Sequence, residues 1–331
     1  MTGVLRAFPA DFRVDEQLGF ELSGDGEHLY LHIEKTGANS EWVAVALGRA
    51  AGIRRRDVGY AGRKDRQAVT RQWFSLWLPH GLATDPADWN IEGVRLLAQR
   101  WHSRKLRTGA LSGNRFEIVL RELAGHDESF AERCASLGSQ GVPNYFGQQR
   151  FGRDGRNLEL ARAMFAGQRR VRRNQRSMAL SAARALIFNE VLAVRVEAGT
   201  WTTPQPGDCL NLAGSQSWFL YDGTDTSVLQ RHAEGDLHVT GPLWGRGNQP
   251  TGLAVAAAEQ EVASRFADLC SGLEKAGLKQ ERRALRVIPA NCQFQLQDDI
   301  LTIAFDLPPG CFATTVIANL VRYRDAAVSA P

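Results

Sequence analysis

The 331-residue sequence lacks the signatures of several common protein classes. Its five cysteines are scattered and form no C-x-x-C pair, so neither a disulfide framework nor a zinc knuckle is indicated. The longest clean apolar runs, such as Trp42–Leu47, are far shorter than the roughly 20 residues that a bilayer requires. The first residues contain no apolar core of a secretory signal. We therefore expect a cytoplasmic protein that does not span a membrane.

The sequence motifs of nucleotide and metal chemistry are also missing. There is no Walker loop, no G-x-G-x-x-G between a strand and a helix, no H-E-x-x-H and no G-x-S-x-G. His28 and His32 are four residues apart, but the residues around them alternate as in a strand. No third zinc ligand accompanies them in the sequence. The sequence therefore predicts neither a cofactor nor a metal.

Positive charge is concentrated in three stretches, although the formal net charge is only +4. Residues 53–71 contain seven basic residues (Lys or Arg) and two acidic ones. Residues 95–107 contain five basic residues and no acidic ones, and residues 141–176 contain nine basic and two acidic residues. Aromatic residues such as Trp73 and Trp101 lie close to or within these stretches. Basic grooves with aromatic platforms are typical of proteins that bind unpaired nucleotides. We therefore expect a face that binds nucleic acid.

Strand-like and helix-like patterns divide the chain into three parts. Apolar alternation predicts strands at Gln72–Leu78 and Arg115–Leu120, and again near the end at Leu301–Phe305. Helical spacing predicts one helix over residues 259–276 and a last helix over Phe312–Tyr323. Strands at both ends with helices and loops between them are typical of an α+β domain that contains an inserted second domain.

The densest chemical pattern is the run Gly59–Trp73, in which two glycines precede a carboxylate among cations. Gly59 and Gly62 allow a tight backbone path. Asp65 follows them and keeps its negative charge among its basic neighbours, so it can serve as a covalent nucleophile. An ordinary surface ion pair gives the same spacing. A glycosidase pair with Asp65 also stays open, formed in three dimensions by Glu16, Asp57 or Glu117.

This run closely resembles the signature of the tRNA pseudouridine synthase D (TruD) family. Four further segments resemble motifs of that family in the same order along the chain: Pro9–Glu16, Lys105–Phe116, Gly141–Gly152 and Pro309–Thr314. The chief departures are Arg63, before the Lys-Asp pair, and Arg6, where the family leads us to expect Lys. Both substitutions keep polarity or charge.

The resemblance implies an isomerase that converts a uridine of tRNA, at position 13, to pseudouridine without cofactor or metal. Asp65 would be the nucleophile, attacking either the ribose or the uracil ring. Lys64 would keep Asp65 anionic or bind backbone carbonyls. The target base must leave its stack, at a cost of about a few kcal/mol. Stacking on an aromatic side chain returns roughly 1–3 kcal/mol of this.

The same resemblance implies the remaining contacts to substrate. Phe116 and Phe312 would contact the target base, whereas Phe12 and Asn114 would make further substrate contacts. Without the motifs, the three phenylalanines could equally be core residues and Asn114 a turn residue.

The resemblance also implies the domain organisation. A pseudouridine-synthase-like catalytic domain, residues 1–140 and 290–331, would contain a mixed, largely antiparallel sheet flanked by helices. An inserted α+β domain would comprise residues 141–289. Because its start, residues 141–176, is basic, we expect this domain to help to clamp tRNA, with Arg169, Arg170, Arg172 and Arg173 among the basic residues. We expect a monomer, because no interface signature stands out. A non-catalytic RNA-binding protein and a glycosidase of small sugars are the alternatives left open.

Overall fold

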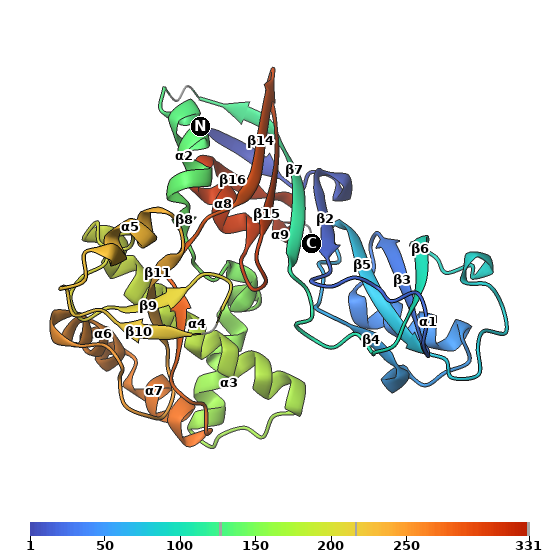
Figure 1. Cartoon of the computed structure of the whole chain (residues 1–331), viewed down its shortest axis with the longest axis horizontal. Coiled ribbons are helices and arrows are strands. Elements are labelled where there is room, and N and C mark those ends of the chain that lie inside the picture. The colour runs from blue at the N-terminus through green and yellow to red at the C-terminus, as the bar shows by residue number, and fades with distance from the viewer. Residues whose placement is uncertain (126–127, 216, 330–331) are drawn as a thin grey trace. The chain divides into compact units, whose positions relative to one another are not determined.

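The computed structural model describes residues 1–125, 128–215 and 217–329, which divide into two compact units (Figure 1). Unit 1 comprises Met1–Gly138, Pro289–Gly310 and Ile317–Pro331, and unit 2 comprises Ser139–Ile288 and Cys311–Val316. Both units contain helices and strands, which confirms the α+β class. Small parts of the two expected domains, residues 126–127, 216 and 330–331, lie outside the described residues.

Unit 1 is built on a sheet of ten strands, seven of which follow in the order β14-β15-β7-β2-β5-β3-β6. Strand β4 pairs with β5, and β1 pairs with both β7 and β16. The strand bounds are β1 (Thr2–Leu5), β2 (Phe12–Gln17), β3 (His28–Lys35), β4 (Val58–Tyr60), β5 (Val69–Trp77), β6 (Val94–His102), β7 (Gly113–Ala124), β14 (Ala290–Gln297), β15 (Ile300–Leu307) and β16 (Arg322–Asp325). The β2–β5 and β1–β16 pairs are parallel and the other described pairs are antiparallel. The sheet is therefore mixed and largely antiparallel, as expected.

One row of directly paired residues crosses five strands of this sheet. It runs from β3 to β15 through Lys35, Thr70, Val14, Phe116 and Phe305. Directly paired residues point to the same face, and so do alternate residues along each strand. This face is the buried one, because each strand contributes buried side chains at these alternate positions.

The next row, on the opposite face, alternates in charge. It runs through Glu34, Arg71, Asp15, Arg115 and Asp306. Arg71 lies 3.0 Å from Glu34 and 3.4 Å from Asp15, and Arg115 lies 3.4 Å from Asp306. Opposite charges on neighbouring strands stabilise this register.

Helix α1 (Ser40–Ala50) covers part of the buried face. Its first turn is capped by the Asn39 side chain, which accepts a hydrogen bond from the Trp42 backbone. Val43 of α1 belongs to the same buried cluster as Ile33 and Phe74 of the sheet. The other helices that lie wholly or partly in unit 1 are α2 (Phe130–Gln140), α8 (Ala313–Leu320) and α9 (Ala326–Ser329), with 3₁₀ turns at Pro9–Asp11, Arg55–Asp57 and Pro86–Asp88.

Among the described residues, five helices and two small sheets lie wholly in unit 2. The strand order is β10-β9-β11-β12 in the larger sheet and β13-β8 in the smaller one. The strands are β8 (Val142–Pro143), β9 (Cys209–Leu212), β10 (Trp218–Leu220), β11 (Leu237–Leu243), β12 (Glu281–Ala284) and β13 (Arg286–Val287). The helices are α3 (Arg156–Phe165), α4 (Arg173–Glu197), α5 (Ser227–Ala233), α6 (Leu253–Arg265) and α7 (Ala267–Lys275), with 3₁₀ turns at Gln148–Arg150 and Arg153–Gly155.

Helix α4 is long and apolar enough, by length and composition alone, to cross a membrane. Half of its most apolar window is buried inside the structure. Ile187 belongs to one buried cluster with Leu273 of α7, and Phe188 belongs to another with Leu210 of β9. A central core helix passes the same length and composition test, and α4 is the core helix of unit 2.

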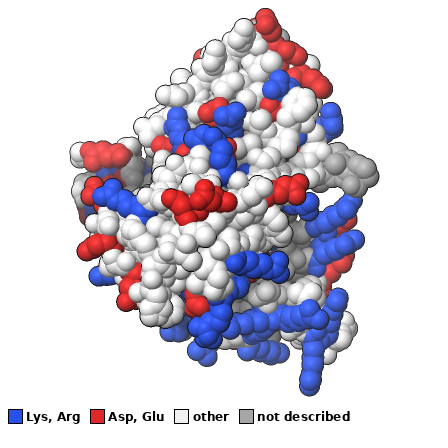
Figure 2. All heavy atoms as spheres, turned by 90° about the vertical axis from the view of Figure 1, so that its right-hand side faces the viewer, with Lys and Arg blue, Asp and Glu red and all other residues white. Residues whose placement is uncertain are grey.

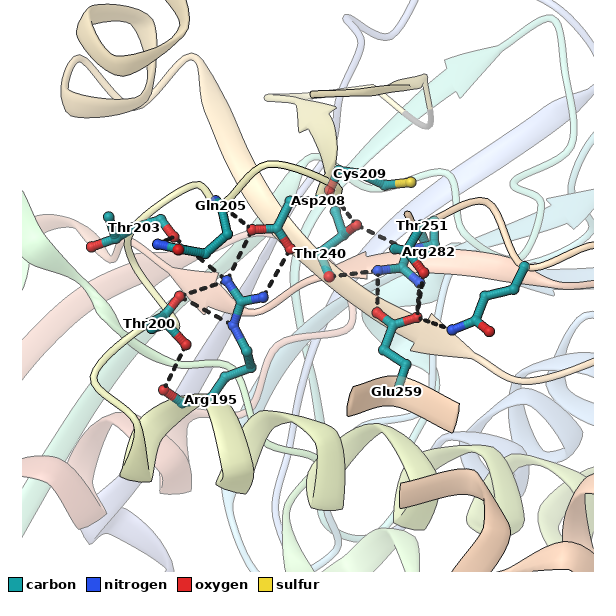
Figure 3. A network of polar contacts seen from close by, with 11 residues as sticks. Arg195, Thr200, Thr203, Gln205, Asp208, Cys209, Thr240, Thr251, Glu259 and Arg282 are labelled. Carbon is teal, nitrogen blue, oxygen red and sulfur yellow. Dashed lines mark hydrogen bonds and ion pairs between the residues drawn. The ribbon is translucent and has the colours of Figure 1, made fainter. Parts of the chain in front are cut away.

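Two buried ion pairs join the helices of unit 2 to its sheet (Figure 3). Arg195 of α4 makes two 2.9 Å hydrogen bonds to Asp208, just before β9. Arg282 of β12 makes hydrogen bonds of 2.9 and 2.7 Å to Glu259 of α6. The Thr240 hydroxyl accepts a further hydrogen bond from Arg282. Each buried charge therefore has a bidentate partner, as burial of ions requires.

Two of the helices predicted from spacing differ from the structure. The segment predicted as one helix over 259–276 is divided at Phe266, whose φ of −124° and ψ of 36° separate α6 from α7. Spacing predicts that the last helix reaches Tyr323, but α8 ends at Leu320 and the chain continues as β16. Strand β1 offers backbone partners to all four residues of β16, and helical periodicity alone does not reveal this partner.

Candidate active site

Asp65 lies in the loop that joins β4 to β5, and Gly59 lies in β4, just before this loop. A Cβ atom at Gly59 would lie 2.3 Å from the carbonyl oxygen of Leu106, a distance that no side chain tolerates. The space around Gly62 is open, and its backbone φ is not in the left-handed region. Of the two glycines in the motif, Gly59 is therefore the one that close packing requires.

Three hydrogen bonds in sequence hold the loop against the first turn of α1. The backbone N–H of Lys64 donates to the Ser40 hydroxyl at 2.9 Å, and this hydroxyl donates to Oε1 of Gln72 at 2.7 Å. The Gln72 amide then donates to the carbonyl of Gly62. Ser40 and Gln72 are both buried, so the loop is held by polar groups that have no access to solvent.

Lys35 fixes the backbone of the candidate nucleophile. Its ammonium donates to the carbonyl oxygens of Ala38 and Asp65, at 2.7 and 2.9 Å. The side chain is fully buried, and this burial lowers the pKa of Lys35 to about 8, although the charge of Asp65 opposes the shift. Lys35 was not singled out from the sequence, since its position in β3 resembles that of any strand-end lysine.

The Asp65 carboxylate accepts two hydrogen bonds that fix its orientation. Oδ2 accepts from Nη1 of Arg6 at 2.5 Å, and Oδ1 accepts from the backbone N–H of Gln67 at 3.1 Å. The side chain stays 30% exposed, whereas that of Arg6 is 9% exposed. The site therefore presents an oriented, ionically paired carboxylate that a reactant can still reach.

Arg6 also contacts a second carboxylate, that of Asp325, through Nε at 3.1 Å and through Nη2. Burial opposes its charge, but the hydrogen bond and charge of Asp325 and the charge of Asp65 raise the pKa of the Arg6 guanidinium. Its backbone φ of 57° lies in the left-handed region, at the turn that follows β1. The sequence identified Arg6 as a departure from the family pattern, but it did not indicate that Arg6 contacts Asp65.

Lys64 contacts a different carboxylate. Its ammonium lies 2.6 Å from Oε2 of Glu16, and Oε1 of Glu16 also accepts a hydrogen bond from the Trp73 backbone at 3.3 Å. The cation that contacts the Asp65 carboxylate is Arg6 and not Lys64. The same geometry shows that Glu16, considered from sequence as a glycosidase partner of Asp65, pairs with Lys64 instead.

Phe12, Phe116 and Asn114 share the buried face of the sheet with Glu16. Their strands pair Glu16 with Asn114 and Val14 with Phe116. Phe12 and Phe116 are 5% and 8% exposed, and their rings meet edge to face with centroids 6.2 Å apart. The Arg6 guanidinium lies 5.2 Å from the centre of the Phe12 ring. Arg6 therefore links Phe12 to Asp65.

Asn114 carries an unused acceptor. Its Oδ1 atom is buried and has no hydrogen-bond partner among the described residues. A buried polar atom without a partner is costly, and in a binding site it indicates a place for a donor from a ligand.

Phe312 lies in unit 2, whereas the other five predicted site residues lie in unit 1. Its ring is nearly buried and meets Phe146 edge to face, with centroids 6.0 Å apart. The Arg150 guanidinium lies 5.4 Å from the centre of the same ring.

Each basic stretch of the sequence contributes exposed side chains. Figure 2, which views the side of α1 and β6, shows Lys and Arg side chains over wide areas, with acidic side chains between some of them. In unit 2 the segment from the end of α3 to the first residue of α4 is strongly basic and exposed at Arg169, Arg170, Arg172 and Arg173. These are the surfaces on which a polyanion would be retained.

Within residues 1–125, 128–215 and 217–329, no group of three His, Cys, Asp or Glu side chains is placed to hold a metal ion. His32 stacks on Trp73, with ring centroids 4.6 Å apart and planes inclined by 8°. The alternation predicted around His28 and His32 is confirmed, since both lie in β3.

Comparison with known proteins gives a consistent result over nearly the whole chain. The family model described as tRNA pseudouridine synthase D (TruD) matches residues 1–168 and 157–320. A protein named tRNA pseudouridine synthase D from Hydrogenovibrio crunogenus is 48% identical over 325 residues, which are 98% of this chain and 94% of the relative. One of the same name from Aeromonas hydrophila is 45% identical over 324 residues, covering 98% and 92%.

A solved structure resembles the chain at the level of the fold. It is a crystal structure from Methanosarcina mazei that also carries the name tRNA pseudouridine synthase D (TruD). It superposes with a TM-score of 0.73 at 18% identity, and it covers 97% of this chain and 93% of its own.

Proposed function

The chain belongs to the tRNA pseudouridine synthase D family, and we propose that it isomerises a tRNA uridine with Asp65 as the nucleophile. Membership makes the protein a tRNA pseudouridine synthase, an isomerase that acts on tRNA. The observation that carries the assignment to Asp65 is its oriented but accessible carboxylate, bound to Arg6 and Gln67 in the motif loop.

The reaction requires two things of the protein, a nucleophile and a pocket that accepts the base. The bond between N1 of uracil and C1′ of ribose must break, the base must turn, and C5 must bond to C1′ with loss of its proton. A carboxylate that attacks C1′ or the ring at C6 can support this exchange without an oxidant or reductant. We therefore propose that no cofactor and no metal take part.

Neighbouring residues on the sheet are proposed to support the extruded base. We propose that Phe116 contacts the base, that Phe12 makes a further substrate contact and that the free Oδ1 of Asn114 accepts the N3–H hydrogen of the base. Lys64 is proposed to act indirectly, since it holds Glu16 beneath the motif loop. Phe312 of unit 2 retains the proposed role of a second aromatic contact to the base.

We assign the catalytic role to unit 1 and propose that the inserted domain, residues 141–289, helps to hold tRNA. The target is proposed to be the uridine at position 13. We also propose that the protein acts in the cytoplasm, and as a monomer because no interface signature stands out in the sequence.

The decisive experiment compares Asp65→Asn with the wild-type protein on tRNA labelled with tritium at C5 of uridine. Turnover, measured as tritium release, should fall by at least about 10³-fold, while tRNA affinity stays within about threefold. Asp57→Asn is the matched control, because Asp57 lies in the same basic stretch but pairs with Arg54. It should keep wild-type turnover.

Tritium release by Asp65→Asn at the wild-type rate would refute the nucleophile assignment. Absence of tritium release from the wild-type protein, with tight tRNA binding, would favour the non-catalytic RNA-binding alternative. A tRNA with cytidine in place of uridine at position 13 tests the position, since it should release no tritium from the remaining uridines.

A further inference from the structure

The guanidinium of Arg6 contacts two carboxylates that come from distant parts of the chain. Nη1 contacts Asp65, 59 residues away, while Nε and Nη2 contact Asp325, 319 residues away. The Arg6 and Asp325 side chains are 9% and 15% exposed. The three groups therefore form a nearly buried chain of ionic contacts, with Asp65 at the end that solvent can reach.

The sheet brings Asp325 to this place. Strand β16 runs parallel to β1, and their register pairs Asp325 with Leu5, the residue before Arg6. The backbone of Ala327 donates to Oδ1 of Asp325 at 3.1 Å, which ties the carboxylate to the start of α9. Asp325 is thus held by its strand and by the following turn, independently of Asp65.

Because Arg6 contacts both carboxylates, its contact with Asp65 is restricted. A guanidinium facing one carboxylate alone commonly binds both of its oxygens through two parallel N–H groups. Here Asp325 binds one edge of the Arg6 guanidinium, so Arg6 donates a single N–H to Asp65. The other carboxylate oxygen of Asp65, Oδ1, accepts from the Gln67 backbone instead. Two carboxylates share one cation, and the trio keeps a net charge of −1.

We propose that Asp325 is a positioning residue for the reaction: it holds Arg6 so that Asp65 is oriented without being fully neutralised or covered. The proposal rests on the function proposed above, because it requires Asp65 to be the nucleophile. Without Asp325, the Arg6 guanidinium turns toward Asp65 and makes a two-point contact. The nucleophile then loses charge density and an accessible oxygen, whereas the surfaces that bind tRNA do not change.

The test is single-turnover and steady-state kinetics of Asp325→Asn, with thermal melting measured in parallel. Turnover should fall by about 10- to 100-fold with KM for tRNA within about threefold of wild type. Asp306→Asn is the matched control, since Asp306 is similarly buried and contacts Arg115 on the opposite face of the same sheet. It should lower kcat by less than about twofold.

A double-mutant cycle separates positioning from a general structural role. The ammonium of Arg6→Lys is a point charge and does not bridge two carboxylates as a fork does. In that background Asp325→Asn should therefore change kcat by less than about threefold. Equal effects of Asp325→Asn in both backgrounds would overturn the proposal, as would an unchanged kcat in the wild-type background.

Should Asp325→Asn melt below the assay temperature, Asp325→Glu decides the question. It keeps the charge but moves the carboxylate by one methylene, so kcat should fall with KM unchanged. Wild-type kcat in a folded Asp325→Glu would then overturn the proposal. The Asp325 variants test only the positioning role. Failure of the nucleophile assignment would be seen separately, as wild-type turnover by Asp65→Asn.

Discussion

The ammonium of Lys64 lies 2.6 Å from Oε2 of Glu16, and the two side chains are 7% and 0% exposed. Lys64 directly precedes the candidate nucleophile, and Glu16 lies on β2 of the central sheet. This buried ion pair joins the motif loop to the sheet, together with the hydrogen bonds that Gln72 and Lys35 donate to the loop. Breaking this pair should therefore destabilise the fold more than breaking a surface ion pair does.

Removing either partner of this pair should destabilise unit 1. Lys64→Met or Glu16→Gln leaves the other group buried without its partner, which costs roughly 3–5 kcal/mol. The double variant removes both charges and should recover a substantial part of that loss. Thermal and urea unfolding would measure it. As a control, Arg54→Met breaks the more exposed pair with Asp57 and should cost less than about 1 kcal/mol. Single variants that are no less stable than this control would contradict the prediction.

Lys35 should make the stability of the protein rise with pH in an alkaline window. Its pKa is about 8 in the folded chain and 10.5 in the reference state, so between these values the unfolded chain binds more protons. The free energy of unfolding therefore increases with pH across this window, by up to roughly 3 kcal/mol for this one group. The neutral amine keeps two N–H donors, enough for the carbonyls of Ala38 and Asp65.

Urea unfolding between pH 7.5 and 10 would measure this effect by comparing the wild-type protein with Lys35→Met. The pH-dependent increment should be missing in Lys35→Met and present in Lys105→Met, which changes an exposed lysine of unit 1. Identical pH profiles for the wild-type protein and Lys35→Met would show that the ammonium of Lys35 is not penalised by burial.

The exposed arginines from the end of α3 to the first residue of α4 should contribute to tRNA affinity by binding phosphate groups. Replacement of Arg169, Arg170, Arg172 and Arg173 by Gln should weaken binding and reduce the steepness of its salt dependence, by about one unit of slope for each phosphate group that the variant no longer binds. Filter binding at several salt concentrations would measure both, and kcat at saturating tRNA should not change. Arg231→Gln, which breaks a pair with Asp236, is the control. Equal salt slopes for the fourfold variant and the wild-type protein would exclude this segment from the tRNA surface.

Local features of unit 1 follow closely from the sequence. Asn39 is a residue type that favours a helix cap, and α1 begins directly after it. The alternation around His28 and His32 predicts a strand, and β3 contains both. Such features depend on residues within a few positions of one another, so the sequence carries the whole signal. The end of α8 cannot be predicted from nearby residues. The chain leaves the helix to pair as β16 with β1, which lies more than 300 residues earlier in the sequence.

The sequence by itself determined the family and the α+β class, and it supplied Asp65 as the proposed nucleophile, because ordered motifs and periodic patterns are properties of short continuous segments. Only the tertiary structure decided which cation meets which carboxylate. The nearest basic residues in the chain, Arg63, Lys64 and Arg66, are not the ones bonded to the Asp65 carboxylate, whereas Arg6 is. The physical reason is that ion pairs form where the sheet register brings side chains together, and a register between distant strands is invisible in the order of residues.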